Sequence, residues 1–257
     1  MKFSVAVVRP PAENFADGLT TANLGSPDHA LALIQHKEYC TALESCGLQV
    51  VRLEPDPRHP DSTFVEDTAV VLPSMVVLTR PGAPSRLGEV AGMVDTAISF
   101  RKNQVHILEP ATLDGGDVCE AGETWFAGIS ERTNQEGIRQ LGKFLGQDNR
   151  NLVSVDIRGI PGLLHIKSGI SWLGEKRLLV TEHLANHPAF TGFEQIIAVR
   201  EESYAANCIL VNGHLLLPAG YPQTSSILNH LGYKIIHLNM SEFQKMDGGL
   251  SCLSLRF

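Results

Sequence analysis

The C-terminal stretch Asp247-Gly248-Gly249-Leu250-Ser251-Cys252-Leu253-Ser254-Leu255-Arg256-Phe257 joins two glycines to a short run that contains one cysteine. Paired glycines allow a sharp backbone turn and let a ligand approach closely. The run after them predicts a strand with Leu250, Cys252 and Ser254 on one face. Most free cysteines are small buried hydrophobic residues. A cysteine at the start of a strand, just past a glycine turn, is also suited to be a reactive thiol in a cleft, and the rest of the chain favours this second interpretation.

Composition and charge restrict the class of protein. The chain has 257 residues, 43% of them hydrophobic and 19% charged, which is ordinary for a globular protein with a sizeable core. The net charge is −7 and no basic run is present, so we expect no nucleic-acid or membrane-surface partner. The apolar run at the N-terminus ends at Arg9 and is too short for a secretory signal. No run approaches the ~18 apolar residues that a membrane-spanning helix needs.

The cysteines indicate a reducing compartment. Five are present, an odd number without close or regular spacing, which argues against a disulfide framework. No two of them form a Cys-x-x-Cys pair, so a structural zinc site is not expected. We therefore predict a cytoplasmic protein in which the four cysteines other than Cys252 are buried, namely Cys40, Cys46, Cys119 and Cys208.

The sequence repeats one unit, which is a polar residue, a β-hairpin, a helix and a returning strand. The first hairpin is expected over Val65–Leu72 and Met75–Thr79, and the fourth has the two-residue turn Asn212-Gly213. The fifth hairpin requires Leu250–Leu255 to pair with the N-terminal strand Phe3–Val8. The polar residues at the heads of the hairpins follow one another at intervals of about 42–51 residues, and they are Glu66, Asp117, His165, Asn207 and Cys252.

Five units of one period imply a radial or solenoid arrangement. If the strands from the two termini pair, the ring closes and leaves no sheet edge exposed. We therefore predict a single α/β domain over residues 1–257, folded as a five-bladed α/β propeller with pseudo-fivefold symmetry. In such a ring, the hairpin heads converge near the axis at one end.

Helix boundaries follow from capping residues. A helix is expected from about Asp28 to Cys46, with Ser26 as its N-cap and Gly47 as its stop signal. Two further helices are expected to begin at a capping Ser85 and a capping Thr133, and to run to about Phe100 and Leu145 respectively.

The converging heads point to catalysis. An acidic residue beside a glycine turn most often stabilises that turn, but a thiol, an imidazole and several acids together are hard to explain by packing. A thiolate is a nucleophile, and a nearby imidazolium lowers the pKa of the thiol. A carboxylate on the imidazole would orient it, and Asp114 is the candidate for that role.

The acids require a cation among them, because clustered carboxylates otherwise repel one another. A metal would serve, but the closely spaced His and Cys ligands of transition-metal sites are missing. A guanidinium fits better, since its planar donors pair with carboxylates such as Glu66 and Asp67. Two loop arginines, Arg86 and Arg132, are either solvated or bind a carboxylate. Together with the acids they suggest a zwitterionic amino acid, whose guanidinium carbon Cys252 attacks.

Eight motifs resemble those of the dimethylarginine dimethylaminohydrolase family, and the resemblance extends from Asp17 to the C-terminus. The motifs are long and occur in order, so the resemblance is specific. This family belongs to the guanidino-group-modifying (pentein) enzymes, whose fold is a five-bladed α/β propeller. The matching stretches are Phe64–Asp67, Thr79–Arg86, Leu113–Val118, Arg132–Asn134, His165–Gly169, Glu202–Cys208, Leu217–Pro222 and Asp247–Cys252.

The resemblance implies a role for each matching residue. Cys252 would be the nucleophile, His165 the general acid and base, and Asp114 the group that orients His165. Some members carry Glu at the position of Asp114, so the shorter side chain would shift His165 slightly. The other residues would bind the substrate: Asp61, Glu66 and Asp67 the guanidinium, Arg86 and Arg132 the carboxylate, and the backbone of Leu19 and Met246 the α-amino group, with Phe64 beside them.

The implied reaction converts asymmetric dimethylarginine or monomethylarginine to citrulline and dimethylamine or methylamine, through a covalent thiouronium intermediate on Cys252. No cofactor is required. A zinc ion held by Cys252 and His165 would inhibit the enzyme. The related arginine deiminases carry an aspartate at the position of Lys167 and a larger helical insertion. Both differences favour the methylarginine hydrolase.

Two alternatives stay open. The first is an arginine deiminase or another guanidine hydrolase, which would release a different amine. The second is a non-catalytic amino-acid-binding propeller or a metal-binding protein, in which Cys252 would form no covalent adduct. The sequence also leaves open whether the protein is a monomer or a homodimer, and whether it prefers mono- or dimethylated substrates.

Overall fold

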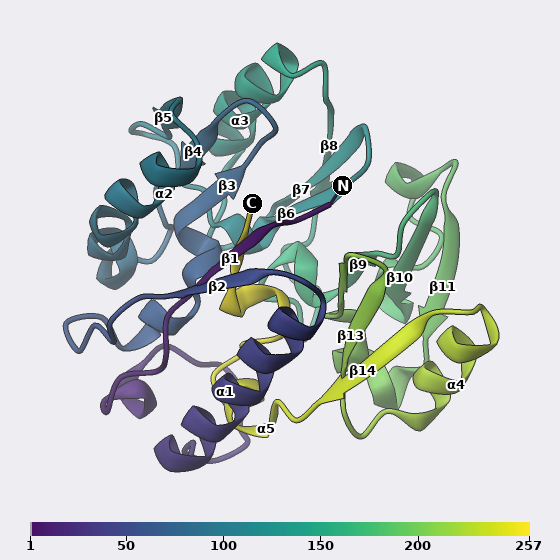
Figure 1. Cartoon of the computed structure of the whole chain (residues 1–257). Helices are drawn as coiled ribbons and strands as arrows, with labels where there is room; N and C mark the ends of the chain where they lie inside the picture. The colour runs from purple at the N-terminus through teal and green to yellow at the C-terminus, as the bar shows by residue number, and fades with distance from the viewer. Residues whose placement is uncertain (1) are drawn as a thin grey trace.

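The structure, a computed structural model, describes residues 2–257 and contains five small sheets arranged as a ring (Figure 1). Each sheet has an inner strand, a middle strand antiparallel to it, and an outer strand parallel to the middle one. In this order, the sheets are β3 (Ala69–Val71), β4 (Val76–Leu78), β5 (Gln104–His106); β6 (Val118–Ala121), β7 (Thr124–Ile129), β8 (Asn151–Asp156); β9 (Ile170–Trp172), β10 (Arg177–Thr181), β11 (Glu194–Ala198); β12 (Ile209–Val211), β13 (His214–Pro218), β14 (Lys234–Leu238); and β15 (Leu255–Arg256), β1 (Val5–Val8), β2 (Gln49–Arg52).

The two ends of the chain close the ring. β15 pairs antiparallel with β1, with Leu255 opposite Val7 and Arg256 opposite Ala6, which confirms the predicted pairing of the termini and the five-bladed α/β propeller. The expectation that closure removes all sheet edges is wrong. Within residues 2–257 the five sheets stay separate and each keeps two edge strands. Neighbouring blades meet through side chains, so the ring is held by packing and not by one continuous ladder.

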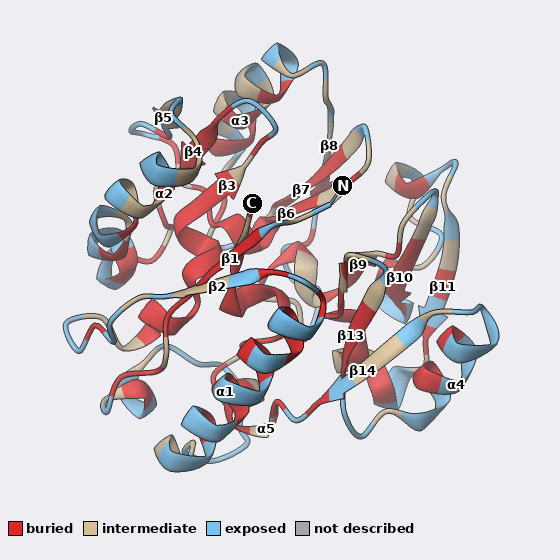
Figure 2. Cartoon of the chain, viewed as in Figure 1, coloured by how far each residue is buried: buried red, intermediate tan, exposed pale blue. Residues whose placement is uncertain are grey.

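Hydrophobic clusters lie between neighbouring blades all around the ring. In one of them, Val70 of β3 packs with Trp125 of β7 and Leu141 of the helix α3. The strands at the centre are largely buried, and the helices turn exposed faces outward (Figure 2). None of the helices in the described part of the chain is long and apolar enough to cross a membrane. The helices are α1 (His29–Ser45), α2 (Val94–Phe100), α3 (Gln135–Gln147), α4 (Pro222–His230) and the single turn α5 (Ser241–Gln244).

All three predicted N-caps are wrong by one or two residues, and Ala83 takes the place of Ser85. Asp28 caps α1 in place of Ser26. Asn134 caps α3 in place of Thr133, because the Thr133 hydroxyl accepts a hydrogen bond from the Asp114 backbone N–H instead (3.1 Å). A side chain with a tertiary partner is thus not available as the cap of its own helix.

The helix predicted from Ser85 to Phe100 is a 3₁₀ helix over Pro84–Met93 followed by α2. Residues three apart eclipse one another in a 3₁₀ helix. This geometry stacks Arg86 on Glu89, and the two form a buried ion pair with Nη2–Oε2 at 2.8 Å.

Each inner strand is preceded by a 3₁₀ turn, so the predictions of strand for Glu66-Asp67 and for Cys252 are wrong. β15 begins only at Leu255. The backbone N–H of Cys252 donates to the carbonyl of Gly249 (3.2 Å), which closes a local turn in place of a strand ladder. The five turns are Val65–Thr68, Gly115–Asp117, Ile166–Ser168, Arg200–Ala206 and Ser251–Leu253.

Candidate active site

The five 3₁₀ turns meet at one end of the ring axis, and each contacts the turns of neighbouring blades. Along a strand, successive side chains point to opposite faces of the sheet. The 3₁₀ turns instead bring several side chains together at this end of the ring axis. Nine of the eleven predicted site residues line one cavity there, namely Leu19, Asp61, Phe64, Asp67, Arg86, Arg132, His165, Met246 and Cys252. Leu164, Asp247 and Gly248, which the sequence analysis did not assign, complete its wall.

The cavity has a volume of about 20 Å³. This is room for about one water molecule, so an amino acid can enter only if part of the wall moves. Three wall residues come from the N-terminal part of the chain: Leu19, Asp61 and Phe64. Of these, Leu19 is the most exposed, at 42%. Its backbone N–H donates to both oxygens of the buried Asp61 carboxylate, at 3.0 and 3.2 Å. Asp61 thus holds the segment that covers the cavity.

His165 is oriented by a carboxylate. Its Nε2 lies 3.0 Å from Oδ2 of Asp114, whose Oδ1 accepts a hydrogen bond from the Gly82 backbone N–H (2.8 Å). The ring lies against Gly116, where a Cβ atom would be only 2.7 Å from Nδ1. Asp114 does not line the cavity, so it acts on the imidazole from behind.

Nearby carboxylates keep His165 charged. Burial by itself lowers the pKa of His165, but the charges of Asp67 and Asp117 and the hydrogen bond with Asp114 outweigh burial and raise the pKa to about 9. At neutral pH the imidazole is therefore protonated and able to give up a proton.

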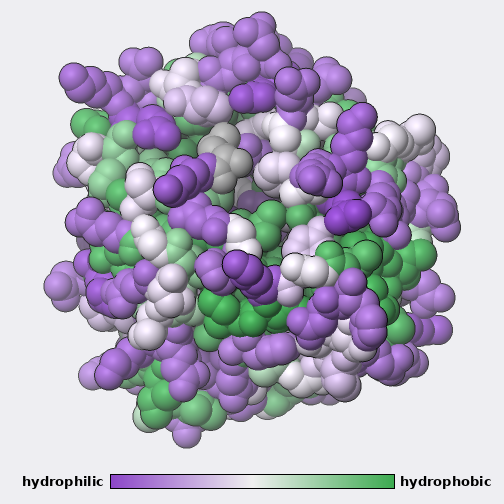
Figure 3. Space-filling view, turned by 45° about the vertical axis from the view of Figure 1, so that its right-hand side comes forward, coloured by the Kyte–Doolittle hydropathy of each residue, from purple (hydrophilic) through white to green (hydrophobic). Residues whose placement is uncertain are grey.

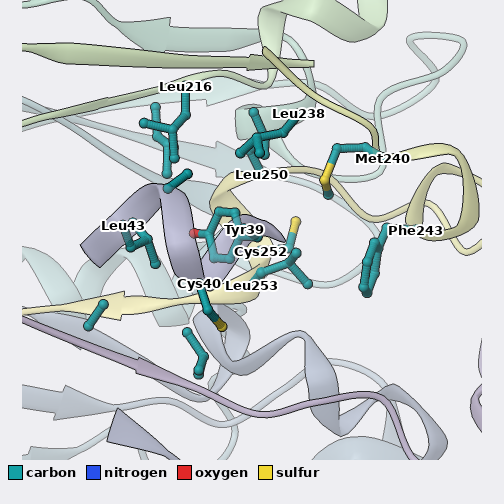
Figure 4. Packing of buried hydrophobic residues seen from close by; sticks show 14 of the residues in the cluster. Tyr39, Cys40, Leu43, Leu216, Leu238, Met240, Phe243, Leu250, Cys252 and Leu253 are labelled. Atoms are coloured by element: carbon teal, nitrogen blue, oxygen red, sulfur yellow. The ribbon is translucent and has the colours of Figure 1, made fainter. Parts of the chain in front are cut away.

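Cys252 lies on the turn Ser251–Leu253 and is 9% exposed. It belongs to a hydrophobic cluster that also contains Leu250 and Leu253 (Figure 4). Burial, followed by the charges of Glu66 and Asp67, raises the pKa of Cys252 to about 12. Unless a further cation binds beside the sulfur, this residue is a neutral thiol.

Arg86, which we predicted to bind a substrate carboxylate, lines the cavity but makes several hydrogen bonds to protein partners. Its Nη1 donates to Oδ2 of Asp67 (2.5 Å), and its Nε and Nη2 donate to Glu89 (3.0 and 2.8 Å). Burial raises the pKa of Asp67, but His165 and Arg86 lower it more strongly, to about 2. Arg132 differs from Arg86. Within residues 2–257, its backbone N–H donates to Oγ of Ser130 (3.0 Å), whereas its guanidinium makes no hydrogen bond.

Glu66, predicted to bind the guanidinium, does not line this cavity. Its carboxylate accepts hydrogen bonds from Nζ of Lys167 (2.7 Å) and from Oγ of Ser251 (2.9 Å), close to the ring axis. Behind these groups lies a second cavity of about 360 Å³, which the inner strands line. The molecule is also visibly hollowed near the centre of the face in Figure 3. Lys167 entered the sequence analysis only as a difference from the deiminases, and nothing in its own neighbourhood predicts the contact with Glu66.

A possible metal-ligand set differs from the predicted Cys252–His165 pair. Asp67, Asp114 and His165 each offer a ligand atom, and these atoms lie within 4.8 Å of one another. Both carboxylates are already engaged, Asp67 by Arg86 and Asp114 by a backbone N–H and the imidazole. The two carboxylates serve to hold the charge on His165.

Several known proteins resemble this chain in sequence and in fold. No protein-family model matches the chain. The chain is 41% identical over 256 residues to the N(G),N(G)-dimethylarginine dimethylaminohydrolase of Pseudomonas aeruginosa, covering 99% of this chain and all of the relative. It is 35% identical over 252 residues to the protein of the same name from Streptomyces coelicolor, covering 98% and 96%.

Solved structures agree in fold. The Pseudomonas aeruginosa protein, as a cysteine-to-serine variant complexed with citrulline, superposes with a TM-score of 0.96 at 40% identity over the full length of both chains. The N-terminal domain of a cyanobacterial arginine dihydrolase, bound to its product, gives a TM-score of 0.87 at 19% identity, covering 100% of this chain and 97% of that one. At 19% identity the second likeness extends to the fold alone.

Proposed function

Because this chain belongs to the N(G),N(G)-dimethylarginine dimethylaminohydrolase family, we propose that it hydrolyses asymmetric dimethylarginine and monomethylarginine to citrulline and dimethylamine or methylamine. The observation that carries the proposal is a single cavity lined by a thiol, Cys252, and an imidazole, His165, that a carboxylate orients. The solved complex of a 40% identical relative with citrulline supports the same product.

The charges of the cavity support a zwitterionic substrate. Asp67 lies beside Cys252 and His165 and would receive the guanidinium. Arg132 would bind the substrate carboxylate, and Arg86 would act mainly by holding Asp67. Since the N–H of Leu19 is bonded to Asp61, its carbonyl would accept from the α-amino group, together with the carbonyl of Met246.

The substrate itself would activate the nucleophile. Burial and two carboxylates favour the neutral thiol of Cys252, so a thiolate forms readily only when a cation enters between them. A bound guanidinium supplies that cation and places its central carbon next to the sulfur. The positive charge of the substrate thus contributes both to binding and to the formation of the attacking species.

The proposed reaction then proceeds in two halves. As the guanidinium binds, the Cys252 thiol loses its proton to solvent. The thiolate adds to the guanidinium carbon, and the C–N bond to the methylated nitrogen breaks as protonated His165 gives its proton to the departing amine. A thiouronium remains bound to Cys252. His165, now neutral, takes a proton from water, and the hydroxide adds to the same carbon. The C–S bond then breaks, the hydroxyl proton passes through solvent back to the sulfur, and citrulline leaves. A placed imidazole contributes about 10²–10⁴ in rate to such steps.

Further features belong to the same proposal. The whole chain, residues 1–257, acts as one catalytic domain, either as a monomer or as a homodimer. All five cysteines are free, which supports a reducing compartment and therefore the cytoplasm.

The decisive experiment measures products from two substrates in parallel. Asymmetric dimethylarginine should give citrulline and dimethylamine in equal amounts, whereas arginine should give little ammonia. Efficient ammonia release from arginine would identify a deiminase instead. Acid-quenched turnover should show, by intact mass, an adduct on Cys252, and neither citrulline nor adduct would be formed by a mere amino-acid-binding protein.

A further inference from the structure

A chain of hydrogen bonds crosses the ring axis directly behind the nucleophile. Lys167 from the third blade donates through Nζ to Oε1 of Glu66 in the first (2.7 Å) and to the carbonyl of Gly115 in the second (3.2 Å). The other oxygen of Glu66 accepts from Oγ of Ser251 in the fifth blade (2.9 Å). Ser251 precedes Cys252 in the same 3₁₀ turn.

The fourth blade completes this network through Asn207. Its Oδ1 accepts from the Ser251 backbone N–H (2.9 Å), and its Nδ2 donates to the carbonyl of Lys167 (3.2 Å). Gly249 packs so closely on this amide that a Cβ atom there would lie 2.4 Å from Cγ of Asn207. The turn that carries Cys252 is therefore held on both its side chain and its backbone by groups from other blades.

Two cations face the buried carboxylate of this network, and Lys167 is the nearer one. Glu66 is 3% exposed, and a buried carboxylate without a partner is strongly unfavourable. Lys167 is the charged group within hydrogen-bonding distance of it, since Nη2 of Arg256 is 3.6 Å away. Among charged groups, Glu66 also has the largest influence on the pKa of Cys252, which it raises. Lys167 thus affects the Cys252 sulfur through Glu66, although Lys167 itself does not line the site cavity.

We propose that Lys167 is a positioning residue for the proposed reaction: by pairing with Glu66 on the ring axis it fixes Ser251, and through Ser251 the direction in which Cys252 presents its sulfur. The inference rests on the proposed function for its enzymatic readout. Lys167 would contribute to the attack on bound substrate and not to substrate affinity.

The test compares four variants of the full chain. Lys167→Met removes the cation, Lys167→Arg retains it, and the double variant Glu66→Gln, Lys167→Met removes both charges so that no carboxylate is left unpaired. Lys176→Met, on the exposed hairpin turn between β9 and β10, is the matched control. The measured quantities are kcat, KM and the rate of adduct formation on Cys252 at saturating asymmetric dimethylarginine.

Lys167→Met should slow adduct formation at least tenfold and change KM less than threefold. Lys167→Arg and the double variant should recover most of that rate, and Lys176→Met should match the unsubstituted protein. A purely structural role would lower the unfolding temperature without changing the adduct rate at saturation. That result, or a change confined to KM, would overturn the inference. If Lys167→Met fails to fold, the double variant provides the test. The positioning role would be overturned if the double variant forms the Cys252 adduct at a tenth of the rate of the unsubstituted protein or less.

A second readout separates failure of the inference from failure of the proposed function. Alkylation of Cys252 by chloroacetamidine, followed by intact mass, reports how the sulfur is presented whether or not methylarginine is turned over. If the unsubstituted protein forms no citrulline from asymmetric dimethylarginine, the proposed function is wrong. Equal alkylation rates in the unsubstituted protein and in Lys167→Met would defeat the positioning role alone.

Discussion

The two ends of the ring axis differ in a way that sequence and cavity size alone would not suggest. At the end where the inner strands begin, the cavity is about 20 Å³ and contains the thiol, the imidazole and the acids. Between the inner strands and at their far ends, the cavity is about 360 Å³ and its wall includes Trp125, Trp172 and Phe257. The close group of acids and imidazole found among residues 2–257 lies at the small end. Reactive chemistry is concentrated where volume is least, because charges must be a few ångströms apart to change one another's pKa.

The difference arises from backbone donors. At the small end, 3₁₀ turns and loops leave N–H groups that no strand ladder uses, and these groups hold the side chains of other segments. The side chains held in this way are Asp61 by Leu19, Asp67 by Gly116, Asp114 by Gly82, Asp117 by Ile166 and Asn207 by Ser251. Along the inner strands, the ladders consume the same groups, so the large cavity lacks this means of fixing polar side chains.

The largest expected effect is on the nucleophile, and a second cysteine provides the contrast. Cys252→Ser should lower kcat by at least roughly 10⁴-fold with little change in the unfolding temperature, since a hydroxyl at this site has no base strong enough to ionise it. Cys119→Ala, at a cysteine that lines the large cavity, should leave kcat unchanged. Steady-state citrulline formation and thermal unfolding measure both. Equal losses in the two variants would remove the functional distinction between the two ends.

The fold was predictable from the sequence because its signals are local. Each blade repeats the same order of elements, and each hairpin carries its own alternation and turn residues, as at Asn212-Gly213. The pairing of β15 with β1 followed from the count of hairpins. The 3₁₀ turns were missed because their form depends on partners in other blades. Ser251, for example, bonds to Glu66 of the first blade and to Asn207 of the fourth.

The sequence predicted most of the residues that line the site, but not which of them bond to one another. From residue types and their period, Cys252 and His165 were expected close together, and both line one cavity. The destination of Glu66 depends on Lys167, 101 positions away, and no local pattern encodes that pair. The pairing of Arg86 with Asp67 and Glu89 likewise depends on the 3₁₀ geometry after Pro84.

Two arginines at the small end should separate stability from affinity. Arg86→Met leaves two buried carboxylates, Asp67 and Glu89, without a cation, and should lower the free energy of unfolding by about 3–5 kcal/mol. Arg132→Met should change stability little but raise KM about 10–100-fold, since a hydrogen bond to a charged group is worth about 1.5–3 kcal/mol. Arg101→Met, at the wall of the large cavity, should change neither by much. Urea unfolding gives the free energy of unfolding of each variant, and steady-state kinetics gives its KM. If Arg86→Met is as stable as the unsubstituted protein and has a raised KM, Arg86 binds the substrate directly.

The stability of the small end should depend on pH through His165. Its pKa is about 9 in the folded protein and about 6.5 in an unfolded chain. Because the folded value is the higher one, the stabilisation by the charged imidazole is complete below pH ~6.5 and is lost as the pH rises through about 9. The free energy of unfolding should therefore fall across this window, by an amount on the order of 1–3 kcal/mol. His165→Gln should remove this fall. A fall that persists unchanged in His165→Gln would assign it to another group.

The smallest expected effect concerns the segment that covers the small cavity. Oδ2 of Asp247 accepts from both the backbone N–H and Oγ1 of Thr21, at 2.5 and 3.0 Å, and so ties the covering segment to the cavity wall. Asp247 has φ of 57°, a conformation that asparagine also tolerates, so Asp247→Asn isolates the loss of charge. KM should rise about fivefold, corresponding to roughly 1 kcal/mol, with kcat unchanged. Asp148→Asn makes the same change where a carboxylate accepts from Ser74 at a hairpin turn (3.2 Å), and should alter neither constant. The rise is expected because the contact re-forms over bound substrate. An unchanged KM in Asp247→Asn would mean that another part of the wall holds the substrate in place.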